Sequence, residues 1–306
     1  MASLTNSQLV HLLACPNCNC DIVEAADRLR CTYCNKEYEI KNGIPLLYHD
    51  NMDLEHLREE EDLAKMMKRP MLSRKDQFSS VQWKNSKREF WGMVRDNIEA
   101  APRSFVNIGC GYDDYFSQFE REDYTFVNFD IVYDMVYTLQ RDFGGRSCVA
   151  GDISRLPFKK NSFDYVACTD VIHHESDNLP GLLESFRNLL KPKGLLFLED
   201  PNAWGMFQFA KSVLLPKPLY RVLRATYHKL KNSSHRPAHY EFPTNVWDVK
   251  NILEKLGFCS TKIYPNIAYP SIGTMSFQVY KFFSRIEWVR KYHNYHYMLS
   301  AMKGQD

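Results

Sequence analysis

Nine cysteines occur in the chain, and five of them lie close together near the N-terminus. Cys15 and Cys18 form one CxxC pair, and Cys31 and Cys34 form a second pair after twelve intervening residues. Four thiolates at this spacing can surround one Zn²⁺ tetrahedrally, because each tight turn directs both of its sulfurs toward a shared centre. A redox pair is the alternative. We expect Cys20 to lie outside the ligand set.

A second group of residues that could bind a ligand lies at and after the β-rich run "SFVNIG". Gly109 and Gly111 form a GxG turn of the kind that approaches nucleotides. Asp113 stands where a third glycine would let a helix N-terminus approach pyrophosphate, and Asp114 follows it. A carboxylate at this position would repel phosphate. The expected cofactor therefore lacks phosphates and carries positive charge.

Acidic residues also close the next strands of the main region. Asp130 ends "VNFD", about twenty residues after the glycines, where an acid can accept hydrogen bonds from both ribose hydroxyls. Asp152 follows "SCVAG", within reach of an adenine amine. A dinucleotide could use these two acids, but S-adenosylmethionine fits the phosphate-free turn better. Ile131, Ile153 and Asp170, each beside a strand end, complete the predicted cofactor contacts.

The stretch "TDVIHHESD" supplies candidates for catalysis. Methyl transfer is an in-line displacement, so a base is needed only where the acceptor must lose a proton. Asp170, His173 and His174 lie beside the expected methyl position and are the predicted catalytic residues. Either histidine could instead cap a helix or pack in a structural network. His239 and Tyr240 are further candidates for facing the acceptor.

The elements that must position these residues alternate between strand and helix. Short β-branched and aromatic runs are separated by helical segments such as "NLPGLLESFRNLLKP". This alternation predicts an α/β fold with a parallel, Rossmann-like sheet covered by helices on both faces. Ligands of such sheets bind at the carboxyl ends of the strands, which is where the glycine turn and the acids are expected.

The order "VNIGCG", "FDI", "GDISRLPF", "SFDYVACTDVIHH" and "LKPKGLLFLEDP" over residues 104–201 resembles the class I methyltransferases of the large family that includes ubiquinone and menaquinone methyltransferases. The resemblance implies a seven-stranded sheet with an antiparallel last strand, "YHYMLSAMK", and S-adenosylmethionine as cofactor. The chain departs from the family at Asn107, where an acid is usual, and at Asp113. No [DN]PP[FY] signature of nucleobase or glutamine methylation follows the fourth strand.

Residues 9–48 resemble a short zinc-ribbon family that includes the activator subunit of tRNA and protein methyltransferases, whose closing half is matched by "YEIKNGIPLL". The resemblance implies a structural metal and a docking surface. We therefore expect a zinc ribbon at 1–48, a linker with leading helices at 49–102, and a methyltransferase domain at 103–306. Within the last, 201–240 forms a lid-like insertion.

Composition bounds the remaining possibilities. The 306 residues are 44% hydrophobic and 25% charged with a net charge of +2, which suits a globular protein and gives no global signal for nucleic acid or membrane binding. The N-terminus lacks a secretory pattern, so we expect a cytoplasmic protein. The charged stretch 53–75 predicts a solvated linker with helical portions, followed by an amphipathic helix that buries Phe90, Trp91, Val94 and Ile98.

Three functions remain open from the sequence. The first is O-methylation of a small-molecule, lipid or glycan acceptor. The basic, partly apolar segment 201–240, with Arg221 and Arg224, favours an anionic acceptor. The second is RNA methylation with the zinc ribbon gripping RNA. The third is a non-catalytic adaptor that docks through the ribbon.

Overall fold

The computed structural model describes residues 9–73, 81–99, 103–112, 124–143, 147–205, 218–219, 222–223, 226, 242–266 and 282–305. For 66–73 and 81–86 it describes the backbone alone. Asp113 and Asp114, His239 and Tyr240, the pair Arg221 and Arg224, and most of the predicted lid at 201–240 lie outside these ranges.

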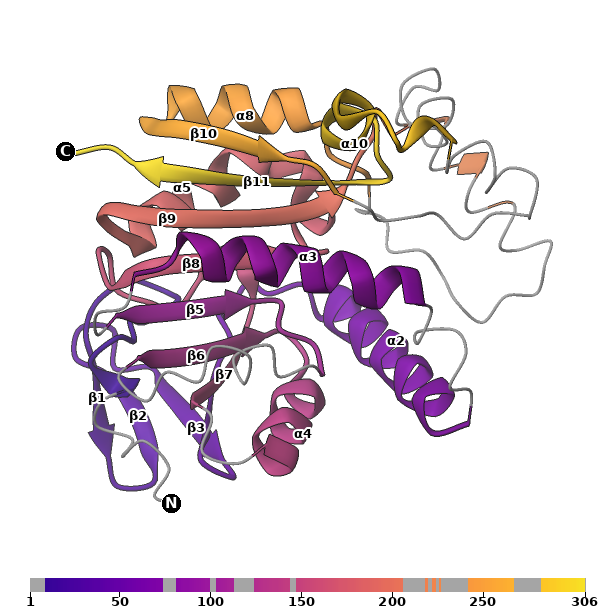
Figure 1. Cartoon of the computed structure of the whole chain (residues 1–306). Helices are drawn as coiled ribbons and strands as arrows, with labels where there is room; N and C mark the ends of the chain where they lie inside the picture. Colours follow the sequence, from indigo (N-terminus) through magenta and orange to yellow (C-terminus); the bar gives the residue numbers. More distant parts are fainter. Residues whose placement is uncertain are drawn as a thin grey trace.

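One sheet of eleven strands dominates the described structure, in the order β1-β2-β3-β4-β7-β6-β5-β8-β9-β11-β10 (Figure 1). The seven strands from β7 to β10 form the expected methyltransferase-type sheet, and β11 is antiparallel to both of its neighbours, which confirms the prediction for the last strand. The bounds of these seven are β5 Ser104–Ile108, β6 Thr125–Asp130, β7 Ser147–Gly151, β8 Phe163–Thr169, β9 Leu190–Pro201, β10 Phe258–Tyr264 and β11 His296–Lys303.

Four N-terminal strands extend this sheet beyond the seven that the sequence predicted. They are β1 Ile22–Ala25, β2 Arg28–Cys31, β3 Glu37–Lys41 and β4 Ile44–Leu47. Strand β4 pairs in parallel with β7, with Leu46 opposite Ala150 and Leu47 opposite Gly151. The N-terminal module also shares one hydrophobic core with the main sheet, in which Leu13 pairs with Phe158 through an isolated bridge.

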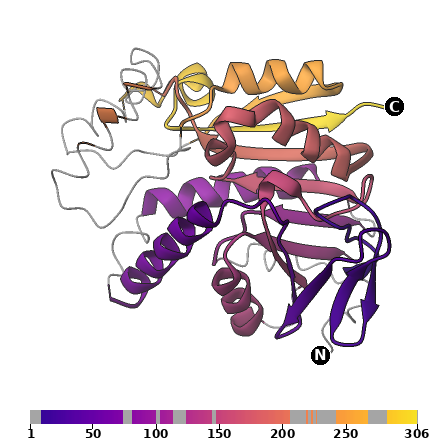
Figure 2. The ribbon, with the colours of Figure 1, turned by 180° about the vertical axis from the view of Figure 1, so that it is seen from behind.

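Helices cover both faces of the sheet. Helix α3 crosses the face seen in Figure 1, whereas α5 lies on the opposite face, seen in Figure 2. Phe90, Trp91, Val94 and Ile98 of the α3 region are buried against Phe105 and other aromatic residues, as the sequence predicted. The helices are α2 Leu54–Ser73, α3 Val81–Asn97, α4 Tyr133–Phe143, η2 Ile153–Arg155, η3 Ile172–Asn178, α5 Leu179–Leu189, α8 Val246–Lys255 and α10 Glu287–Tyr292.

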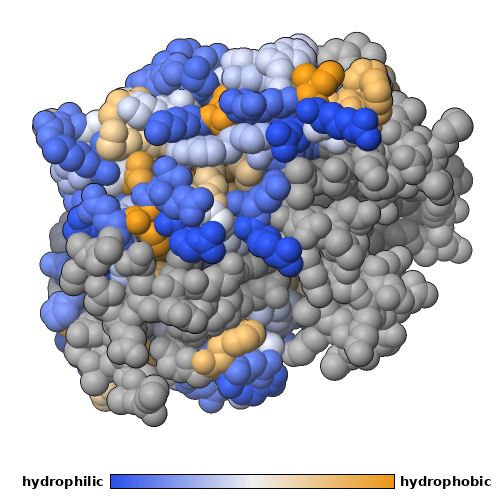
Figure 3. Space-filling view, in the orientation of Figure 1, coloured by the Kyte–Doolittle hydropathy of each residue, from blue (hydrophilic) through white to orange (hydrophobic). Residues whose placement is uncertain are grey.

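The described surface in the orientation of Figure 3 is mostly hydrophilic, with hydrophobic side chains in small separate areas. Among the helices that the structure describes, none combines the length and the apolar character needed to cross a membrane.

Gly151 determines how closely β4 can approach the main sheet. A Cβ atom at this position would lie 2.8 Å from the carbonyl oxygen of Leu47 and 3.0 Å from Cε2 of Phe129. The first of these atoms belongs to the backbone and cannot rotate away. Gly151→Ala should therefore force β4 outward and lower the free energy of unfolding by about 1–3 kcal/mol, as measured by urea denaturation.

Gly92→Ala is the matched control, because its Cβ would meet only Arg95 Nη2, at 3.9 Å within helix α3. This change should leave stability equal or raise it by up to about 1 kcal/mol. Equal stabilities of the two alanine variants would contradict the proposed tight contact between β4 and β7.

Candidate functional site

Polar residues gather where the parallel strands of the main sheet end. Because β7, β6, β5, β8 and β9 are neighbours in this order, their carboxyl ends form one continuous edge. We call it the carboxyl edge and define it by one residue at the end of each strand: Gly109, Asp130, Asp152, Asp170 and Asp200.

The glycine turn is fixed by its own backbone. Gly109 has φ of +70°, and a Cβ there would lie 2.1 Å from Cγ2 of Val171, so this position requires glycine. The N–H groups of Gly109 and Cys110 both donate to the carbonyl of Phe129, at 2.8 and 3.1 Å. Gly111 N donates to Oδ2 of Asp130 at 2.9 Å. The turn after β5 and the acid at the end of β6 therefore form one rigid unit.

Asp130 is buried and its carboxylate accepts two backbone hydrogen bonds. Besides Gly111, Val132 N donates to Oδ1 at 3.0 Å. Burial raises the pKa of Asp130, and these backbone N–H groups oppose the shift. Each carboxylate oxygen has a second acceptor position, so Asp130 can be held in place and still accept hydrogen bonds from a ribose.

The N-terminal module reaches the same edge through the residues that follow β4. The hydroxyl of Tyr48 donates to the carbonyl of Ile131 at 2.8 Å. His49 is buried, and its Nε2 lies 3.0 Å from Oδ2 of Asp152 and 3.1 Å from Oγ of Ser154. Asp152 also caps η2 by accepting from Ser154 N at 2.8 Å. Two predicted cofactor residues thus receive contacts from a module predicted to be separate.

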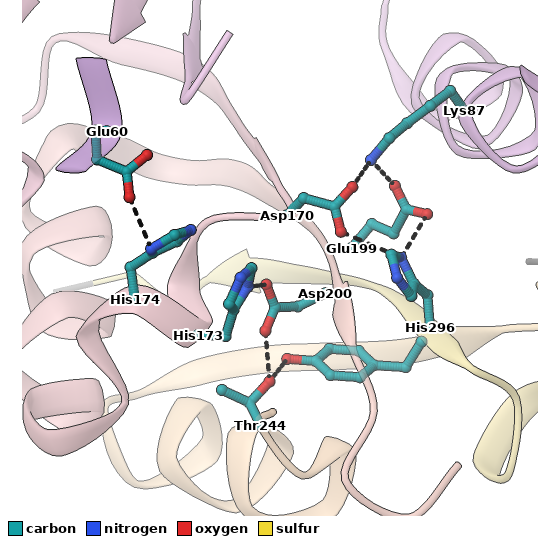
Figure 4. Close-up of polar contacts among 10 residues, drawn as sticks. Glu60, Lys87, Asp170, His173, His174, Glu199, Asp200, Thr244 and His296 are labelled. Atoms are coloured by element: carbon teal, nitrogen blue, oxygen red, sulfur yellow. Dashed lines mark hydrogen bonds and ion pairs between the residues drawn. The ribbon is translucent and has the colours of Figure 1, made fainter. Parts of the chain in front are cut away.

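An ion cluster lies at the ends of β8 and β9, with Lys87, Glu199 and His296 buried and Asp170 partly exposed (Figure 4). Nζ of Lys87, from α3, lies 2.6 Å from Asp170 and 2.7 Å from Glu199. Nδ1 of His296 lies 3.3 and 3.4 Å from the same two carboxylates. Burial alone would lower the pKa of Lys87, but the two carboxylates outweigh it and raise that pKa. The cluster therefore stays ionised.

This cluster changes the interpretation of Asp170. Burial would raise the pKa of Asp170, but the Lys87 ammonium and His296 lower it below its usual value. A carboxylate so stabilised is a weak proton acceptor. Asp170 also has φ of +56°, which is uncommon for a residue other than glycine. Its contacts favour a role in fixing the loop after β8, and its predicted catalytic and cofactor roles stay predictions.

His173 lies in a separate chain of polar contacts. Its Nδ1 is 2.9 Å from Oδ1 of the fully buried Asp200. Thr244 donates to Oδ2 of Asp200 at 2.8 Å, and the hydroxyls of Thr244 and Tyr297 are 2.7 Å apart. A carboxylate that accepts the Nδ1 proton leaves Nε2 as the acceptor of the imidazole. This is the arrangement that a histidine general base requires.

His174 faces a different partner. Its Nδ1 lies 3.4 Å from Oε1 of Glu60 on α2, and its ring centroid is 6.1 Å from that of His56. The rings of His173 and His174 are 4.3 Å apart. The three predicted catalytic residues are thus neighbours at one edge, but each belongs to its own network (Figure 4).

The four predicted zinc ligands lie together in the N-terminal module. Sγ of Cys15 is 3.6 Å from Sγ of Cys34, and Sγ of Cys18 is 3.5 Å from that of Cys31. All four sulfurs lie within 4.8 Å of one another. Cys20 is outside this group, with its Sγ 3.6 Å from the carbonyl oxygen of Cys18.

The sequence reasoning did not single out Tyr48, His49 or Lys87, although all three contact residues of the carboxyl edge or residues beside it. The polar residues directly after the strand "IPLL" were a signal that another strand end was present. Nothing local to Lys87 indicated that it would be buried, because its carboxylate partners lie 83 and 112 positions away.

Comparison with known families identifies the central part of the chain. Residues 106–198 match the family described as "Methyltransferase domain". The matched segment makes up less than a third of the chain. It includes the glycine turn, Asp130, Asp152 and both predicted catalytic histidines.

Curated relatives match the chain over part of its length. A protein of Encephalitozoon cuniculi that is named as an inferred methyltransferase is 30% identical over 135 residues, 42% of this chain and 59% of the relative. The mitochondrial arginine-hydroxylase NDUFAF5 of Danio rerio is 25% identical over 175 residues, 56% of this chain and 50% of the relative. The chain thus spans between half and three fifths of the length of these two relatives.

A solved structure shares the fold. It belongs to the complex between the Haloferax volcanii Trm112 methyltransferase activator and a methyltransferase, with a TM-score of 0.52 and 14% identity, covering 81% of this chain and 97% of that chain. The comparison supports the methyltransferase-type fold of the main sheet.

Glu175, in η3, adds a titrating group near this edge. Burial, and then the nearby carboxylates Asp152 and Asp177, raise its pKa from 4.5 to about 7. The folded state therefore holds this proton more tightly than the unfolded state, and the stability gained at low pH is lost as pH rises from 4.5 through about 7.

Glu175→Gln should remove this loss. We expect the thermal midpoints of variant and parent to agree below pH 4.5, and the variant to be the more stable one above the folded pKa of about 7. The exposed Glu184→Gln serves as the control and should follow the parent. A constant difference between Glu175→Gln and parent at all pH values would contradict the assignment.

Proposed function

We propose that this protein is an S-adenosylmethionine-dependent methyltransferase that binds its cofactor along the carboxyl edge. The observation that carries the proposal is the rigid unit of the glycine turn and Asp130, in the strand context of a methyltransferase domain. Asp130 would bind the ribose hydroxyls, and Asp152 with Ile131 and Ile153 would line the adenine site. When bound, the cofactor supplies an electrophilic methyl group.

His173 is the residue that we propose as general base. Asp200 orients its ring, and Thr244 and Tyr297 hold Asp200 in turn. Such a base serves an acceptor that must lose a proton, which favours a hydroxyl of a small molecule, lipid or glycan. RNA methylation and a non-catalytic adaptor remain the competing proposals, and cytoplasmic location stays a prediction.

We also propose a structural Zn²⁺ at Cys15, Cys18, Cys31 and Cys34. A tetrahedral ion with Zn–S bonds of about 2.3 Å separates its sulfurs by about 3.8 Å, and the observed pairs at 3.5 and 3.6 Å come close to this distance. The ion would stabilise the module that extends the sheet. The partner of that module is then, at least in part, the methyltransferase domain of the same chain, through β4 and β7.

Because one relative is named as an arginine-hydroxylase, the test should identify the reaction product as well as measure the rate. Purified protein should be incubated with cofactor and cell-extract fractions, and products should be analysed by mass spectrometry. Transfer of a methyl group supports the proposal. Addition of an oxygen atom would contradict it.

Asp130→Asn tests the cofactor site. The change keeps the size of the side chain but removes its charge and one acceptor, so S-adenosylmethionine affinity should fall by about 1.5–3 kcal/mol. Calorimetry measures it directly, with the exposed Asp142→Asn on α4 as a control that should bind like the parent. Equal affinity of Asp130→Asn and parent would place the cofactor elsewhere, and no binding by the parent would favour the adaptor.

His173→Gln tests the base. Cofactor affinity should stay within about twofold, whereas transfer of labelled methyl groups to extract acceptors should fall by about 10²–10⁴-fold. The exposed His11→Gln is the control for loss of a histidine. Parental transfer by His173→Gln would exclude it as the base.

A further inference from the structure

A cluster of two imidazoles and one carboxylate lies between α2 and the loop after β8. We define the His–Glu–His cluster as His56, Glu60 and His174. His56 and Glu60 are four residues apart on α2, so they occupy the same face of the helix. His174 comes from η3 and points toward Glu60 (Figure 4). One ligand atom from each residue lies within 4.8 Å of the others.

The distances within the cluster resemble those of metal ligands. His174 Nδ1 and Glu60 Oε1 are 3.4 Å apart. Two ligands about 2.0–2.1 Å from a tetrahedral Zn²⁺ are separated by about 3.3 Å. A direct charge-assisted hydrogen bond between the same groups would measure about 2.7–2.9 Å. The observed separation matches a shared ion better than a direct bond.

A second cluster of carboxylates and an imidazole differs from the His–Glu–His cluster because it already contains a cation. Asp170, Glu199 and His296 also lie within 4.8 Å of one another. There, however, the ammonium of Lys87 lies 2.6 and 2.7 Å from the two carboxylates and supplies the positive charge. A metal ion in that cluster would compete with a buried ammonium group, so we assign no metal there.

We propose that His56, Glu60 and His174 bind one divalent transition-metal ion. Imidazole and carboxylate donors suit Zn²⁺, Co²⁺, Ni²⁺ and Fe²⁺, whereas Mg²⁺ and Ca²⁺ prefer oxygen alone. Three protein ligands leave at least one coordination position for water or for an oxygen of a bound molecule. The side chains of Glu60 and His174 are 14% and 15% exposed, which shields the site and leaves a path to solvent.

The position of the cluster links this ion to the carboxyl edge. One turn beyond Glu60, Ala64 packs against Val132 and Met135, beside the residue that follows Asp130. On the other side, His174 is the neighbour of His173, the proposed base. The ion would hold α2 against the edge and place its open position near the acceptor side. The site stands on its own contacts and does not depend on the methyltransferase proposal.

Cobalt titration of the whole 306-residue chain after chelator treatment tests the site. The parent should take up one Co²⁺ with the thiolate charge-transfer absorption of the cysteine site. A second Co²⁺ should show only the weaker visible bands of nitrogen and oxygen ligands. Glu60→Gln and His56→Ala should abolish the second uptake and keep the first, whereas Glu55→Gln, an exposed neighbour on α2 with the same loss of charge, should keep both.

Circular dichroism of each metal-free variant controls for folding, and His174→Ala provides a third variant should one of the others unfold. Cobalt uptake by the parent that is limited to the thiolate site would overturn the proposal. So would parental uptake of the second ion by both Glu60→Gln and His56→Ala. Neither cobalt uptake nor circular dichroism requires S-adenosylmethionine. Failure of the metal site can therefore be told apart from failure of the proposed function.

Discussion

The parallel pairing of β4 with β7 is the constraint on which the site depends. Two register pairs, Leu46 with Ala150 and Leu47 with Gly151, join the N-terminal module to the edge of the main sheet. Because the pairing is parallel, β4 ends at the same edge as β7, and its next residues, Tyr48 and His49, contact the backbone and acids of that edge. The module therefore extends the carboxyl edge as well as the sheet.

Polar contacts then position the two leading helices. The ammonium of Lys87 binds α3 to Asp170 and Glu199. Glu60 of α2 lies 3.4 Å from His174 of the loop after β8, the separation at which we propose a shared metal ion. Removing one partner of a buried ion pair leaves an uncompensated charge, which costs far more than the pair itself contributes. Both helices therefore lie beside the carboxyl edge.

His173 and Asp170 belong to separate networks of polar contacts at this edge. Asp170 is held ionised by Lys87 and His296, and so serves to position the chain. His173 is positioned by Asp200, and in the proposed function its second ring nitrogen would accept the proton of the acceptor. The proposed metal would bind His174, which shares neither of these two networks.

Much of the main sheet and the positions of Gly109, Asp130 and Asp152 were predictable, because strand periodicity and strand-end chemistry are local in sequence. The union of the N-terminal module with the sheet was not, since the pairing of Leu47 with Gly151 joins residues more than a hundred positions apart. The same holds for Lys87, whose burial depends on partners from β8 and β9. A sequence pattern predicts on which face of a helix a charged residue lies, but whether that face is buried depends on tertiary contacts.

A crystal structure of the full chain grown with S-adenosylmethionine would test the central claim most directly. The account predicts the ribose hydroxyls within hydrogen-bond distance of Asp130, the adenine beside Asp152 with His49 behind it, and the methyl group directed toward His173. Cofactor bound away from Asp130, or an N-terminal module detached from β7 in the complex, would contradict it.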